Sequence, residues 1–263
     1  MNCKNCNSVL KDAQKFCDEC GAKVIQNRLT PKVLAAQVNE QFISIDNKFL
    51  STFVDLFKKP EAVIDGYIHG TRKKYIDVLQ YFTIALTFTG IQVFLMTTFF
   101  KESLDFSTGF MEGFNTASSQ KDIPFKNLDF NAFNQFQGLI YIITVPFSAL
   151  GSWLAYYLLG ERTYNFTEHM VLNLYYSAQV IIITAVLSIL FLILGLDYLI
   201  ISTLVTLPTF IYLFYVLKRV FNNSFWETLA RFILVMTIYI GSMIVLVIIG
   251  GIIVALYLVI THK

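Results

Sequence analysis

Residues 232–260 read FILVMTIYIGSMIVLVIIGGIIVALYLVI, and this stretch decides the fold class. It contains no charged residue. As a helix it is longer than the roughly 20 residues that cross the hydrocarbon core of a bilayer. The stretch therefore predicts a transmembrane helix, long enough to tilt or to break at Gly250-Gly251.

The composition of the whole chain agrees with a membrane location. Of its 263 residues, 56% are hydrophobic and only 14% are charged, and the mean hydropathy is +0.60. Soluble domains are about 45–50% apolar and about 25% charged. Lipid must therefore replace water around much of the surface. The net charge of +2 gives no reason to expect a nucleic-acid partner.

A length of about twenty apolar residues per helix divides residues 78–263 into five spans. The predicted spans cover residues 78–100, 139–159, 175–194, 198–217 and 232–260. Only Gly195-Leu196-Asp197 separates the third span from the fourth, which predicts a tight hairpin. The alternative is a single irregular helix. The predicted fold class is an all-α membrane protein of about five transmembrane helices.

All four cysteines lie close to the N-terminus as two Cys-x-x-Cys pairs, Cys3/Cys6 and Cys17/Cys20. Four thiolates hold one zinc ion tetrahedrally and leave no open position. The spacing predicts a small β-hairpin zinc ribbon in residues 1–27 with a structural Zn²⁺. An iron–sulfur centre or a redox dithiol is the alternative. The ribbon is too short to build a core, so metal binding would supply most of its folding free energy.

The charges between the spans predict an orientation. Basic residues flank several spans, at positions 72–74, 162, 218, 219 and 231, whereas the segment 101–137 is mainly acidic. The positive-inside rule places the N-terminus in the cytoplasm and the segment 101–137 and the C-terminus outside. The Cys-rich N-terminus carries no signal peptide, and thiolates that bind metal suit a reducing compartment. We expect a multi-pass protein of the cytoplasmic (inner) membrane.

Two further segments are predicted outside the spans. Residues 28–77 are amphipathic, with one apolar stripe from Val33 to Ile45 and a second from Phe49 to Phe57. The two predicted helices lie in the membrane interface, pack on the bundle, or do both. The Phe-rich segment 101–137 is expected to form a partly helical flap, with a disordered loop as the alternative. The predicted domains are residues 1–27, 28–77 and 78–263.

Eight residues before the first span carry a resemblance to a known family. They are Thr52, Leu56, Pro60, Tyr67, Ile68, Gly70, Arg72 and Tyr75. In this order they resemble the DUF3667 family, which joins a four-cysteine ribbon to such a block ahead of a membrane domain and has no assigned activity. The five-span remainder is more loosely similar to Yip-type membrane proteins, a likeness of fold that carries no function.

The spans offer few groups for chemistry. Their interiors contain no ionisable residue, although transporters and membrane enzymes usually place one at mid-depth. Glu168 and His169, just before the third span, are the nearest. They form either a polar site at the membrane edge or an ordinary helix cap. No catalytic motif is present, so we expect no enzyme.

These features favour an integral membrane protein that acts as a non-enzymatic adaptor or assembly factor. The alternative is a small transporter or channel component. The expected partners are the lipid bilayer and a protein that binds the ribbon or the cytoplasmic helices. A homo-oligomer is a further expectation, and no nucleic acid is expected.

Overall fold

The computed structural model describes residues 2–11, 14–24, 30–32, 48–100, 135–196 and 198–261, with only the backbone course of residues 199 and 253–261. The chain divides into two compact units, Met1–Asn47 and Lys48–Lys263. The predicted stripe from Val33 to Ile45 and the outer segment as far as residue 134 lie outside the described residues.

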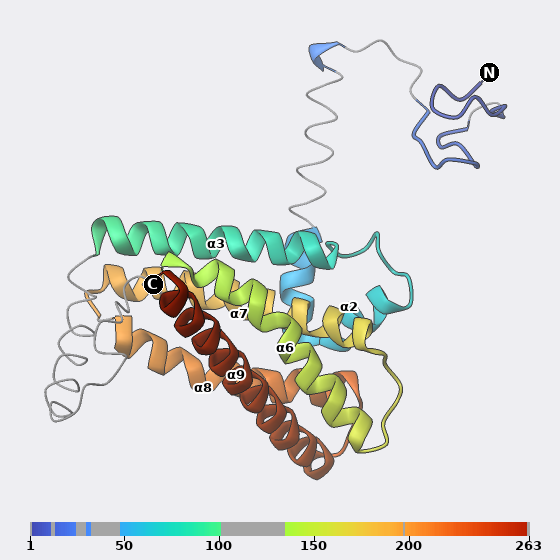
Figure 1. The fold of residues 1–263 in the computed structure, drawn as a ribbon. Coiled ribbons are helices and arrows are strands. Elements are labelled where there is room, and N and C mark those ends of the chain that lie inside the picture. The colour runs from blue at the N-terminus through green and yellow to red at the C-terminus, as the bar shows by residue number, and fades with distance from the viewer. Residues whose placement is uncertain are drawn as a thin grey trace, which may run out of the picture. The chain divides into compact units, whose positions relative to one another are not determined.

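The second unit is helical throughout its described elements. In chain order it contains a helix over residues 48–58, α2 (Pro60–Ile68), α3 (Val78–Phe99), α6 (Gln137–Leu158), α7 (Phe166–Ile193), α8 (Tyr198–Val220) and α9 (Phe225–Thr261) (Figure 1). Five of these helices, α3 and α6 to α9, are long and apolar enough to cross a membrane. The chain is therefore a multi-pass membrane protein, as its composition predicts.

Two helices begin earlier than the hydropathy predicts. Helix α7 starts at Phe166 instead of residue 175, and α9 starts at Phe225 instead of residue 232. Polar caps explain both starts. Asn165 and Glu168 form a capping box ahead of α7, and Ser224 exchanges hydrogen bonds with Glu227 ahead of α9. Hydropathy locates the apolar middle of a helix and misses its polar first turns.

The fifth span is not broken at Gly250-Gly251, and the third and fourth spans do not merge into one helix. Helix α9 runs on through Gly250 and Gly251. Its 37 residues span about 55 Å, more than a bilayer core is thick, so the helix tilts or extends beyond it. Helices α7 and α8 are separate: Gly195 has a φ of +79°, and the Leu196 amide donates to the Phe191 carbonyl at 3.1 Å, which closes the C-terminus of α7.

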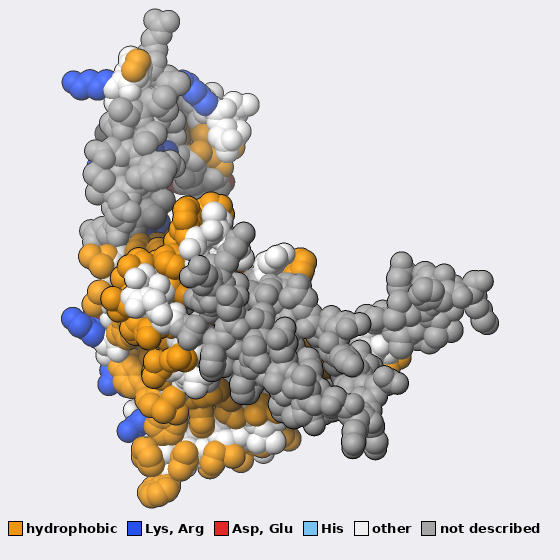
Figure 2. Space-filling view, turned by 90° about the vertical axis from the view of Figure 1, so that its left-hand side faces the viewer, with side chains coloured by type: hydrophobic (Ala, Val, Ile, Leu, Met, Phe, Trp, Pro, Cys, Tyr) orange, Lys and Arg blue, Asp and Glu red, His pale blue; other side chains and the backbone are white. Residues whose placement is uncertain are grey.

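Helix α7 lies at the centre of the bundle and contacts α2, α3, α6 and α8. Helix α9 packs mainly on α6, which it crosses in Figure 1. The crossing is close, because a Cβ atom added to Gly151 would lie 3.2 Å from both the Tyr239 Cβ and the Val235 carbonyl oxygen. The outward faces of the helices are apolar (Figure 2), as lipid contact requires.

The N-terminal unit contains no strand among its described residues. Two isolated antiparallel bridges, Asn2–Val9 and Phe16–Lys23, stand where the β-hairpin was predicted. Each bridge closes a turn around one cysteine pair, so no two extended segments run side by side. The predicted hairpin is not confirmed.

Candidate functional site

The four cysteine sulfurs form one cluster. All of them lie within 4.8 Å of one another, and all four cysteines are free thiols. The Sγ atoms of Cys3 and Cys20 are 3.7 Å apart, and those of Cys6 and Cys17 are 3.6 Å apart. Sulfurs bound tetrahedrally at about 2.3 Å from one zinc ion are about 3.8 Å apart, whereas a disulfide needs about 2.05 Å. The donor set and its spacing therefore fit a single metal ion.

Both cysteine pairs use the same turn. The Asn7 amide donates to the Cys3 carbonyl at 2.8 Å, and the Gly21 amide donates to the Cys17 carbonyl at 2.9 Å. Asn7 and Gly21 occupy the same place in each turn and have φ angles of 60° and 68°. Glycine and asparagine tolerate this left-handed conformation best. The repeated turn points both sulfurs of each pair toward the common centre.

Hydrogen bonds favour the thiolate form that a metal requires. The Ser8 hydroxyl lies 3.1 Å from the sulfurs of both Cys6 and Cys17. This hydroxyl, helped by the Cys20 backbone amide, lowers the pKa of the Cys17 thiol to about 6. A cysteine with such a pKa is largely ionised at neutral pH and ready to bind a metal ion.

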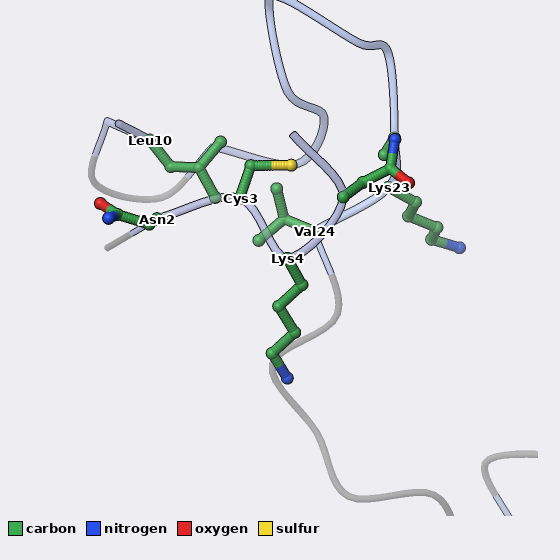
Figure 3. A pocket seen from close by; sticks show the side chains of 8 residues that line it. Asn2, Cys3, Lys4, Leu10, Lys23 and Val24 are labelled. Carbon is green, nitrogen blue, oxygen red and sulfur yellow. The ribbon is translucent and has the colours of Figure 1, made fainter. Parts of the chain in front are cut away.

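Little else holds this unit together. Its only apolar cluster within the described residues consists of Cys3, Leu10 and Cys17, with Ala22 and Val24 against it. Figure 3 shows Leu10 and Val24 beside Cys3, around a hollow of about 110 Å³. Such a cluster is too small to stabilise a fold without a bound ion.

Glu168 and His169, neighbours in sequence, do not form a common site. The Glu168 carboxylate accepts a hydrogen bond from the Asn165 amide at 2.7 Å, while the Glu168 amide donates to the Asn165 side chain at 3.0 Å. Glu168 therefore acts as the helix cap considered as the alternative above. His169 faces the bundle interior and is buried.

A buried network of polar side chains surrounds His169, and little in the sequence indicates it. The His169 Nδ1 lies 3.1 Å from the Ser152 hydroxyl, to which the Asn173 amide donates at 2.9 Å. The Ser148 hydroxyl donates to the Asn173 side-chain oxygen at 2.6 Å. Serines 148 and 152 and residues 169 and 173 have four-residue spacings on facing helices, the one signal that could have revealed them. This network contains no charged side chain, and it joins α6 to α7.

The segment 48–77 lies against the bundle. The second predicted stripe faces helices: Leu56 is fully buried, Phe49 contacts Tyr81, and Phe57 contacts Tyr212. Of the two open interpretations, packing on the bundle is the one that the contacts show for this stripe.

Side chains of α7 and α8 bind the end of the 48–58 helix. Carbonyls in the last turn of a helix have no partner within it. The hydroxyls of Tyr212 and Tyr215 donate to the Leu56 and Lys58 carbonyls, each at 3.1 Å. The Gln179 amide donates to the Phe53 carbonyl at 3.1 Å. The bundle thus supplies the donors that this helix end lacks.

The turn before α3 is fixed by one buried residue, Ile76. Its amide donates to the Thr52 hydroxyl oxygen at 3.0 Å, and its carbonyl accepts from the Tyr175 hydroxyl at 2.7 Å. The Thr52 hydroxyl in turn donates to the Lys48 carbonyl at 2.7 Å. Both backbone groups of Ile76 are therefore satisfied by side chains.

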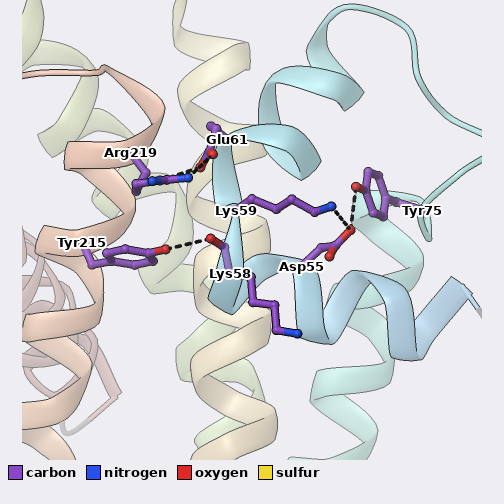
Figure 4. A network of polar contacts seen from close by, with 7 residues as sticks. All are labelled: Asp55, Lys58, Lys59, Glu61, Tyr75, Tyr215 and Arg219. Carbon is purple, nitrogen blue, oxygen red and sulfur yellow. Dashed lines mark hydrogen bonds and ion pairs between the residues drawn. The ribbon is translucent and has the colours of Figure 1, made fainter.

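Two tyrosine–aspartate hydrogen bonds link parts of the segment 48–77 to one another. Tyr75 donates to Asp55 at 2.8 Å (Figure 4), and Tyr67 donates to Asp77 at 2.9 Å. Burial, together with the Asp55 carboxylate, raises the pKa of Tyr75 to about 12. Burial and the Asp77 carboxylate likewise raise the pKa of Tyr67.

An ion pair ties the same segment to α8. The Arg219 guanidinium binds both carboxylate oxygens of Glu61, with Nε donating at 3.1 Å and Nη2 at 2.5 Å (Figure 4). Lys59 lies 3.5 Å from Asp55 within the segment. Bidentate Arg–carboxylate geometry fixes orientation better than a single contact.

This segment is also where the chain matches a known family. Residues 46–90 match the model of a family described as Protein of unknown function (DUF3667). We call residues 46–90 the DUF3667 segment after this match. The resemblance predicted from the sequence is confirmed over that stretch. No curated protein and no solved structure matches the chain.

The pattern of the DUF3667 segment has a structural basis. Thr52 accepts from the Ile76 amide, and Tyr75 donates to Asp55. Leu56 and Pro60 are buried. Gly70 has a φ of +98°, which a residue with a side chain rarely adopts. The Arg72 guanidinium lies 5.2 Å from the centre of the Tyr67 ring. These residues fold the segment onto the bundle and form no reactive group.

Proposed function

We propose that the chain is a non-enzymatic adaptor or assembly protein whose metal-bound N-terminal unit binds a protein partner. The four-sulfur cluster carries the proposal, because four thiolates occupy every position of a tetrahedral ion and leave none for a substrate. Charged residues in the five spans lie only near helix ends, which gives no support to membrane chemistry.

We propose zinc as the metal and a structural role for it. Thiolate ligands in a tetrahedral set favour zinc or iron–sulfur centres, and four sulfurs that all lie within 4.8 Å of one another fit around a single ion. Elemental analysis of the purified chain should give about one zinc per chain. Iron or no metal would overturn the assignment.

The proposed orientation places the N-terminal unit and the DUF3667 segment in the cytoplasm. Loops expected there meet at one end of the bundle, since Tyr164 donates to Asp65 and Arg219 binds Glu61. A tag at the C-terminus should then be digested by protease added to spheroplasts, whose outer membrane is disrupted. Protection of that tag would reverse the orientation.

The partner-binding surface is proposed to lie on the N-terminal unit. Phe49, Phe53 and Leu56 of the second stripe pack against the bundle, whereas Leu50 and Phe57 are exposed by 61% and 43%. Val9 and Phe16 are exposed by 82% and 52%, and each belongs to one of the two bridges. Exposed apolar side chains on so small a unit favour protein contact.

Crosslinking in membranes followed by affinity purification tests this proposal. The wild-type chain should capture a partner that Cys17→Ser loses together with the metal. The double variant Val9→Ser/Phe16→Ser should lose the partner but keep the metal, which separates the surface from the fold. Identical partners for all three proteins, or none for any, would contradict an adaptor role.

A second candidate, a small transporter or channel component, is favoured by one observation. A cavity of about 220 Å³ among the spans is lined largely by hydroxyl and amide side chains, and one of about 260 Å³ has a mixed lining of hydroxyl and apolar side chains. Uptake of a solute into vesicles that contain the chain, and into empty vesicles as the control, tests it. The apolar face of α9 supports a homo-oligomer as a further proposal.

A further inference from the structure

One cavity, of about 220 Å³, lies among α3, α6, α7 and α8. Uncharged hydrogen-bonding side chains dominate its lining: Gln92, Gln137, Tyr141, Ser188, Tyr198 and Thr206. Gln92 and Ser188 are buried, whereas Ser202 and Thr206 are exposed, so the cavity is open on its α8 side. No charged residue is among the described residues that line it. The volume is enough for several water molecules at about 30 Å³ each.

The lining contains an acceptor that the protein leaves unpaired. The Gln137 side-chain amide donates to the hydroxyls of Tyr141 at 3.0 Å and Tyr198 at 3.4 Å. Its carbonyl oxygen, Oε1, is buried and has no partner among the described residues. Leaving such an oxygen unpaired costs about 1–3 kcal/mol. A donor from a bound molecule or water would remove this cost.

Toward the DUF3667 segment the cavity adjoins a larger one of about 390 Å³. The two cavities share Val180, Thr184, Val205 and Thr209, and the larger one is also lined by Phe57 and Tyr212. Gln179, next to Val180 on α7, is fully buried and bonded to Tyr81 and to the Phe53 carbonyl, and Tyr212 donates to the Leu56 carbonyl. The DUF3667 segment therefore holds the side chains at this end of the cavity in place.

We infer that this cavity binds a small uncharged molecule rich in hydroxyl groups. A lining without charge cannot compensate an ion for its lost hydration. A purely apolar molecule would leave the amides and hydroxyls unpaired. The inference rests on the second candidate function and names its ligand class.

A pair of adjacent cysteine substitutions tests whether the cavity is wet. Thr206→Cys places a thiol in the cavity lining, whereas Leu207→Cys places one on a side that is 66% exposed and apolar. A charged, membrane-impermeant methanethiosulfonate reagent should label Thr206→Cys and leave Leu207→Cys unlabelled. The unsubstituted chain, with its four native cysteines, sets the background. Equal labelling of the two variants would overturn the inference.

Protection by polyols tests the ligand class. Glycerol or sorbitol should slow labelling of Thr206→Cys more than about threefold, the slowing expected at two-thirds occupancy. Sodium chloride at the same osmolarity should not slow it. Adding Gln137→Leu should abolish protection while labelling persists. Absence of protection by both polyols, or equal protection by the salt, would contradict a polyol site.

Flux separates this inference from transport. Vesicles that contain the chain should take up glycerol no faster than empty vesicles if the cavity binds glycerol without letting it pass. Labelling and protection without flux would support the binding site and remove the transport function. Glycerol flux through a chain whose Thr206→Cys is unprotected would support transport and overturn this site.

Discussion

The N-terminal metal unit and the DUF3667 segment are both too short to build a core, yet they are stabilised in opposite ways. The metal unit surrounds four sulfurs with a minimal cluster around Leu10. The DUF3667 segment buries Leu56, Val63 and Ile64 completely against the membrane helices. With the proposed zinc bound, the first is stabilised by the ion and the second by the bundle. We expect damage to one to leave the other intact.

The largest expected effect is loss of the metal unit. Cys3→Ser/Cys6→Ser removes half of the ligand set and with it most of a binding free energy of about 10–16 kcal/mol. Zinc content should fall from about one per chain to zero, while the unfolding temperature of the helices should stay unchanged. Ser8→Ala, which keeps all four sulfurs, is the matched control and should retain the zinc. A drop in helix stability would show that the two units are coupled.

The converse damage is a substitution in the DUF3667 segment. Thr52→Val keeps the shape of the side chain but leaves the buried Ile76 amide without its acceptor. We expect a loss of about 2–3 kcal/mol in unfolding free energy, measured by denaturation in detergent, with zinc content unchanged. Thr83→Val is the control, since the exposed Thr83 hydroxyl donates only to the Leu79 carbonyl of its own helix. Equal effects of the two variants would contradict the role given to Thr52.

A substitution inside the bundle tests how far helix packing alone determines the stability of the membrane unit. Gly151→Ala inserts a Cβ atom 3.2 Å from the Tyr239 Cβ and the Val235 carbonyl oxygen, where α6 meets α9. Overpacking of this kind should cost about 1–2 kcal/mol of unfolding free energy. Gly90→Ala, whose Cβ would meet nothing within 4 Å, should be neutral or slightly stabilising. If both variants behave alike, the close helix crossing is not a determinant of stability.

The smallest expected effect is a pH dependence confined to the DUF3667 segment. The folded state raises the pKa of Tyr75 from 10.0 to about 12, so the protonated tyrosine is the stabilising form. Its contribution is complete below pH 10 and is lost as pH rises through 12. Tyr75→Phe should lower stability at pH 8 by about 1 kcal/mol and weaken the alkaline loss. Identical unfolding profiles of variant and wild type from pH 8 to 12 would argue against the Asp55 contact.

The sequence was sufficient for features that depend on local spacing. The long apolar runs gave the spans, and the two Cys-x-x-Cys pairs gave the sulfur cluster. The early starts of α7 and α9 were also visible, since Asn165-x-x-Glu168 and Ser224-x-x-Glu227 are capping signatures that hydropathy ignores.

Features that depend on partners distant in the sequence could not be predicted from it. The stripe from Phe49 to Phe57 looks the same whether lipid or a helix covers it, because periodicity defines a face and not what lies against it. The hydroxyls of Tyr175 on α7 and Tyr215 on α8 bind carbonyls 99 and 157 residues away. No local pattern encodes such pairs. The β-hairpin predicted from the cysteine spacing is not confirmed, because the described residues around the two tight turns form only isolated bridges.

The most direct test of separate stabilisation is a chelation experiment on the unaltered chain. Zinc content and thermal unfolding of the helices are measured on one detergent-purified sample before and after EDTA treatment. We expect zinc to fall from about one per chain to none with no shift in the unfolding temperature of the helices. A clear decrease in that temperature on zinc removal, or the absence of zinc from the untreated chain, would contradict the account.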